Sequence, residues 1–149
     1  HNKRCDEDNC DLNRGYRQKH PPIVKAQLDL LGRTRFDLAI NLHEDYDGQG
    51  VYLYEPLRKK PHWGERIIEA MSAGIPVDPR KNIDGNKAKG GVIRRRITED
   101  MMTDWPEAIA LHFRYAKRTF TLETASEFGI EARVAAHVAG ISAAIRLIE

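Results

Sequence analysis

The sequence has no long apolar run, few cysteines and no marked excess of either charge. No apolar segment approaches the ~20 residues of a membrane-spanning helix. Lys and Arg total 24 against 22 for Asp and Glu, and this near-balance argues against the strongly basic face of a nucleic-acid-binding protein. We therefore expect a soluble, cytoplasmic protein that binds neither membranes nor nucleic acids. These features leave its oligomeric state open.

The two cysteines, Cys5 and Cys10, are too few for a disulfide scaffold and lack the second pair of a zinc ribbon. They are either structural thiols or a disulfide within one loop. The sequence also starts with His1 rather than methionine, its first residues are polar, and no signal-peptide pattern is present. We expect the chain to be part of something longer.

The length and the spacing of apolar residues indicate one α/β domain. A chain of 149 residues buries roughly 70% of its unfolded surface, which is enough for one core. Helical and extended patterns alternate, which indicates a mixed sheet flanked by helices. We expect helices over Pro22–Leu31, Trp63–Gly74 and 129–149, another starting at Thr103 or Asp104, strands over Phe36–Leu42, 50–57 and 117–125, and an exposed loop over 78–92.

Two of the predicted strands end in residues that are able to do chemistry. One ends at His43 and opens into an acidic loop, and another ends at Glu123. Polar residues at the ends of strands often form the sites of α/β proteins, and an imidazole with a carboxylate base suggests metal-assisted hydrolysis. Each residue also has a structural explanation: His43 as a hydrogen-bonded histidine, and Glu123 as a cap of the following helix.

Three short motifs, in order along the chain, carry a family resemblance. They are R-x6-D-L-N-R from Arg4 to Arg14, D-L-x-x-N-L-H-E-D at residues 37–45, and T-F-T-L-E-T at residues 119–124. Together they resemble the zinc carboxypeptidase family, which includes metallocarboxypeptidases and their desuccinylase and aspartoacylase relatives. The resemblance implies a carboxypeptidase-like fold.

The resemblance also implies roles for five residues. Arg4 would polarise the scissile carbonyl, while Asn13 and Arg14 would bind the terminal carboxylate of the substrate. His43 would be a zinc ligand. Glu123 would be the general base that takes a proton from the zinc-bound water and returns it to the leaving amine.

The family places two further zinc ligands in an H-x-x-E motif upstream of D-L-N-R, where this sequence has none. We therefore expect the C-terminal portion of a zinc carboxypeptidase-like catalytic domain that is inactive alone. The pair His62 and Glu65 has the right spacing on a helix but the wrong order, and is a weaker candidate metal site. Composition alone would make Arg4 and Arg14 solvated loop charges.

The expected function is hydrolysis of a peptide or amide bond next to a free carboxylate. A deacylase acting on N-acyl amino acids would use the same residues, and a non-catalytic module that only binds carboxylates is a third alternative. The substrate would be a peptide or an N-acyl amino acid with a free carboxylate.

Several other polar residues near these motifs have simpler interpretations. Asp45 and Asp47 read as loop charges, with one of them a potential partner of His43. Tyr52 and Tyr54 alternate along a strand and read as structural residues. The run of arginines at 94–96 would favour acidic substrates if it lined the site, but a run of three charges is usually a solvated face.

Overall fold

The structure is a computed structural model that describes residues 5–18, 20–58 and 60–149. Its residues group into two compact units, which we describe separately. The first unit contains the residues up to Ala39 together with Thr98–Thr119, and the second contains Ile40–Ile97 and Phe120–Glu149. No helix formed by the described residues is long and apolar enough to cross a membrane.

The helices of the first unit begin and end where local signals place them. Helix α1 spans Pro22–Leu31 as predicted, because proline suits the first turn and the helix ends at Gly32, which has a positive φ of 52°. Helix α3 (Glu107–Ala110) begins after Pro106, a few residues later than predicted, and continues as the π-helical turn η2 (Leu111–Tyr115). A short 3-10 helix, η1, covers Leu12–Arg14.

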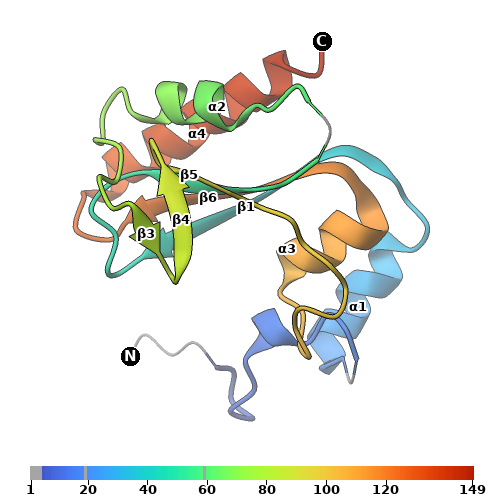
Figure 1. Cartoon of the computed structure of the whole chain (residues 1–149). Coiled ribbons are helices and arrows are strands. Elements are labelled where there is room, and N and C mark those ends of the chain that lie inside the picture. Colours follow the sequence, from blue (N-terminus) through green and yellow to red (C-terminus); the bar gives the residue numbers. More distant parts are fainter. Residues whose placement is uncertain (1–4, 19, 59) are drawn as a thin grey trace. The chain divides into compact units, whose positions relative to one another are not determined.

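Among the described residues, the sheet has six strands in the order β1-β6-β2-β5-β4-β3. Figure 1 shows this sheet with most of its strands labelled. Strand β2 pairs in parallel with β5 and antiparallel with β6, so the sheet is mixed. Its strands are β1 (Phe36–Asp45), β2 (Tyr52–Pro56), β3 (Asn82–Ile83), β4 (Asn86–Lys89), β5 (Val92–Arg95) and β6 (Ala116–Ala125). With helices packed on it, this sheet confirms the predicted α/β class.

Helices α2 (Gly64–Met71) and α4 (Ile130–Arg146) pack against each other over the strands of the second unit, as Figure 1 shows. Gly140 makes this close packing possible, since an added Cβ would lie 2.8 Å from Met71 and 3.0 Å from Leu122. The side chains of Leu53, Ile67, Met71 and Leu122 are fully buried there. Both helices were predicted.

The prediction of an exposed loop over residues 78–92 is wrong. The chain there forms the β3–β4 hairpin and starts β5. The turn residues Asp84 and Gly85 have φ values of 51° and 72°, and Gly90 and Gly91 have 54° and 72°. Asp-Gly and Gly-Gly with positive φ at both positions are turns that connect antiparallel strands, so the turn signals marked strand ends rather than a long loop.

Candidate functional site

His43 and Glu123 lie side by side on adjacent strands of the second unit. Nδ1 of His43 on β1 is 3.6 Å from Oε1 of Glu123 on β6. The side chain of His43 is 39% exposed, whereas that of Glu123 is only 9% exposed. Both strands continue two residues beyond these positions, to Asp45 and Ala125, so the two residues lie within strands rather than at their ends.

The surroundings of Glu123 favour its neutral form. Burial is the main cause, followed by the negative charges of Asp45 and Asp84, and together they raise the pKa of Glu123 to about 8. A carboxyl group whose pKa lies near neutrality exchanges protons readily under physiological conditions. Perturbed carboxyl groups of this kind are common at functional sites.

Two tyrosines from β2 extend the same face of the sheet. Tyr52 is paired across the sheet with Glu123, and its hydroxyl donates to Oδ2 of Asp45 over 3.0 Å. Tyr54 donates to Oδ2 of Asp84 over 2.9 Å. Burial is the first cause that raises the pKa of both tyrosines, so both hydroxyls remain protonated donors.

Asp45 belongs to β1, so its assignment to a loop is wrong. Its Oδ2 atom accepts a bond from Nη2 of Arg80 at 3.2 Å in addition to the Tyr52 hydroxyl. Arg80 is also bound to Asp78, whose side chain is fully buried. No motif in the sequence indicated Arg80, because its contact with Asp45 joins two segments that lie far apart in the chain.

The predicted carboxylate-binding pair lies in the first unit. Asp11 accepts a bond from the backbone N–H of Asn13 over 3.0 Å and so caps η1. Oδ1 of Asn13 accepts a bond from the backbone N–H of Glu107 over 2.9 Å, which leaves the Nδ2 group as the donor end of the amide. Arg14 is exposed, and its Nη1 atom donates to the Asn13 carbonyl over 2.7 Å.

Three other residues named from the sequence have different outcomes. Arg4, the predicted carbonyl-polarising residue, lies outside the described residues. Cys5 and Cys10 are free thiols.

The candidate metal pair of His62 and Glu65 is not supported by its surroundings. Both carboxylate oxygens of Glu65 accept bonds from Arg94, at 2.9 and 2.7 Å. Hydrogen bonding to Arg94 is the first cause that lowers the pKa of Glu65. Arg94 also contacts the buried Glu55. The prediction that the arginines at 94–96 form a solvated face is therefore wrong for Arg94.

The described residues do not complete a metal site. Among them, no group of three or more His, Cys, Asp and Glu side chains is arranged to hold an ion. Catalytic zinc normally has three protein ligands, and the site described above offers one imidazole, that of His43. The residues present therefore do not fit a whole zinc site.

Comparisons with known proteins give structural neighbours only. No protein-family model matches the sequence, and no curated protein matches it. A crystal structure of a "putative metallopeptidase" from Shewanella amazonensis superposes with a TM-score of 0.75 at 16% identity, covering 95% of this chain and 56% of that one. Proteins of the same name from Shewanella denitrificans and Shewanella baltica give TM-scores of 0.73 and 0.72, both at 19% identity.

These neighbours establish the fold class rather than an activity. At 16–19% identity, the likeness shows a shared fold alone. The chain spans about half the length of these neighbours, since it covers 56%, 52% and 54% of them. The fold is therefore one that proteins named as metallopeptidases share.

Proposed function

We propose that this chain is the C-terminal portion of a zinc carboxypeptidase-like catalytic domain, which hydrolyses a peptide or amide bond next to a free carboxylate. The observation that carries the proposal is the 3.6 Å approach of His43 to the buried Glu123. The order of motifs along the sequence and the metallopeptidase-like fold support it. A carboxyl group with a raised pKa beside an imidazole suits proton transfer during hydrolysis.

In this proposal, Glu123 accepts a proton from the attacking water and delivers it to the leaving amine. Its buried position excludes bulk water, and the neighbouring Tyr52 keeps a protonated hydroxyl on the same face of the sheet. Asn13 and Arg14 supply the donors for the substrate carboxylate, with the Asn13 amide oriented by Glu107. Arg4 keeps the role that the resemblance implies.

Zinc is part of the proposal, and this chain supplies one of its ligands. A bound zinc ion would activate water and polarise the scissile carbonyl. His43 is the candidate ligand, and we expect the other two from an H-x-x-E motif outside the sequence given. The isolated chain would then be inactive.

The deciding experiment replaces Glu123 by Gln in the full-length protein that contains this chain. We expect a loss of turnover of about 10²-fold or more with unchanged zinc content. Glu127→Gln is the matched control, because Glu127 is exposed and lies just beyond β6. Simultaneous loss of zinc and activity in Glu123→Gln would make Glu123 a ligand or a structural residue, and full activity would end the proposal.

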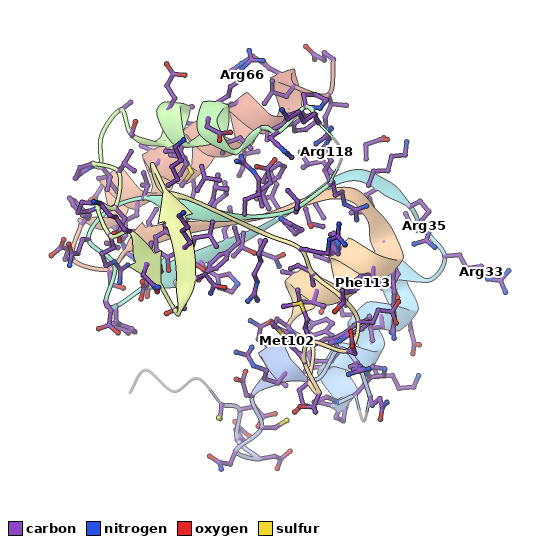
Figure 2. The ribbon with its side chains drawn as sticks, in the orientation of Figure 1. Arg33, Arg35, Arg66, Met102, Phe113 and Arg118 are labelled. Atoms are coloured by element: carbon purple, nitrogen blue, oxygen red, sulfur yellow. The ribbon has the colours of Figure 1, made fainter. Side chains whose placement is uncertain are left out.

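The substrate class is tested with pairs of substrates that differ only at their C-terminus. Peptides and N-acyl amino acids with free carboxylates should be cleaved, and their amidated counterparts should be poor substrates. Changing Arg14 to Ala should weaken binding of the free-carboxylate member of each pair by about 1.5–3 kcal/mol, the range for a hydrogen bond to a charged group. Arg33→Ala is the control, since Figure 2 shows its side chain extending outward at a site beyond α1. Equal losses of binding for the free-carboxylate and the amidated member would mean that Arg14 does not bind the substrate carboxylate.

A further inference from the structure

Arg80 lies in an ion-pair network that reaches the candidate site from a buried anchor. The anchor is Asp78, which accepts bonds from the backbone N–H groups of Gln49 and Arg80, both at 2.9 Å. The Asp78 backbone itself is fixed, because its N–H donates to the carbonyl of Val51 over 3.0 Å. Asp78 is therefore a rigid support on which the position of Arg80 depends.

The guanidinium of Arg80 is bound at two ends. Its Nε atom lies 2.9 and 3.0 Å from the two carboxylate oxygens of Asp78, and its Nη2 atom lies 2.6 Å from Oδ2. The same Nη2 atom donates to Oδ2 of Asp45 over 3.2 Å. The guanidinium carbon also lies 5.8 Å from the centre of the Tyr52 ring. The planar fork of arginine suits such a bridge between two carboxylates.

Asp45 connects this network to both candidate residues. It lies two positions after His43, so their side chains point to the same face of β1. Its carboxylate also binds Tyr52, the cross-strand partner of Glu123. Its carbonyl accepts bonds from the backbone N–H groups of Gly48 and Ser126, at 3.3 and 3.0 Å, and Ser126 directly follows β6. Residue 45 thus joins the ends of the strands that carry His43 and Glu123.

We propose that Arg80 is a positioning residue, which holds the Asp45 carboxylate in its contact with Tyr52 and so fixes the ends of β1 and β6 around the His43–Glu123 pair. Without Arg80, a partly exposed carboxylate two residues from His43 would lose its cationic partner. It would then be free to leave the Tyr52 hydroxyl, and the ends of β1 and β6 beside the pair would lose a fixed point. The inference deepens the proposed function and rests on it for its catalytic consequence.

The first test is independent of catalysis and uses backbone amide exchange. Changing Arg80 to Met in the full-length protein should reduce the protection of the Gly48 and Ser126 amides at least tenfold, while the amides of α4 keep theirs. Arg66→Met is the control, because Arg66 is an exposed residue of α2, where Figure 2 shows it at the surface. Unchanged protection of both amides in Arg80→Met would overturn the proposal.

The second test is a double-mutant cycle on hydrolysis of a free-carboxylate peptide. Arg80→Met should lower kcat about tenfold or more with little change in KM, a loss typical for partners that orient site residues. If Arg80 acts by holding Asp45, the double variant R80M/D45N should be no slower than R80M. Losses that multiply in the double variant would show that Arg80 acts independently of Asp45, and would overturn the assignment.

The two tests separate this inference from the proposed function. If peptide hydrolysis is absent, or if Glu123→Gln leaves it unchanged, the proposed function fails. The amide-exchange result then decides the positioning role of Arg80 alone. If Glu123→Gln abolishes turnover and the kcat losses of R80M and D45N multiply in the double variant, the proposed function stands and the role of Arg80 fails.

Discussion

Oδ1 of Asn13 accepts a hydrogen bond from the backbone N–H of Glu107, the first residue of α3, over 2.9 Å. Side-chain oxygens commonly satisfy the unpaired N–H groups at a helix start. Here the oxygen comes from a distant segment of the chain, because the residue before Glu107 is proline, which has no such side-chain group. Asn13 therefore has a structural contact as well as its predicted role in carboxylate binding.

This contact allows the two roles of Asn13 to be separated by substitution. Asn13→Ala should lower the free energy of unfolding by about 1 kcal/mol, because the N–H of Glu107 loses its acceptor. Asn13→Asp should keep most of that stability, since it retains an oxygen near the positive end of the helix. It should still lose binding of free-carboxylate substrates, because it replaces a donor by a negative charge. Urea unfolding and a substrate-binding titration measure the two effects, and equal stability losses in both variants would contradict the capping role.

The raised pKa of Glu123 predicts a pH-dependent stability. Its pKa rises from an ordinary value of 4.5 to about 8 in the folded protein, so the folded state binds the proton more tightly than the unfolded state. The free energy of unfolding should therefore fall as the pH rises from about 4.5 through about 8, with a slope approaching ~1.4 kcal/mol per pH unit.

Replacing Glu123 by Gln removes this titration, so the variant should become progressively more stable than the native protein as the pH rises. Urea unfolding of both proteins at pH 5, 7 and 9, with metal removed by a chelator, measures the difference. Glu127→Gln should show no such trend, because Glu127 is exposed. If the free energies of unfolding of Glu123→Gln and the native protein differed by the same amount at every pH, the raised pKa of Glu123 would be contradicted.

The contact of Arg94 with Glu55 predicts a large loss of stability in Arg94→Met. Glu55 is 4% exposed and accepts bonds from Trp63 N at 2.9 Å and Gly64 N at 3.3 Å, at the start of α2. Arg94 lies 2.5 Å from the same carboxylate. Its removal leaves a buried charge without a cationic partner, which typically costs about 3–5 kcal/mol. Denaturant unfolding should detect this loss, whereas the exposed Arg96→Met should change stability by at most about 0.5 kcal/mol.

The elements that the sequence predicted best are those with strong local signals. The proline and glycine around α1 mark its two ends, and the apolar spacing of α4 marks a long helix. Strands β3 and β4 were missed because Ile83 and Ala88 are their only buried residues. With so little apolar alternation, the turn residues between them dominated the pattern.

The candidate site was predictable only where one residue carries the chemistry. His43 and Glu123 were named from their types and their places on predicted strands, and the structure brings them together at 3.6 Å. Arg80 could not be named, because its importance depends on its contact with Asp45, which comes from a distant segment of the chain. The sequence shows Arg80, Asp45 and Asp78, but it does not show that Asp45 lies against the other two in the folded protein.

The last prediction is that the chain of residues 1–149 by itself binds zinc weakly and hydrolyses no peptide. No three His, Cys, Asp or Glu side chains among the described residues are arranged to hold an ion, and His43 is the one imidazole of the candidate site. Affinity at catalytic zinc sites comes from several ligands held in a fixed geometry. After dialysis against zinc-free buffer, metal analysis should find far less than one zinc per chain, and His43→Ala should change this little. A longer chain that contains an upstream H-x-x-E motif should retain one zinc and lose it when His43 is changed to Ala. Stoichiometric zinc and peptidase activity in the short chain would contradict the prediction, and His62→Ala would then show whether a second site is responsible.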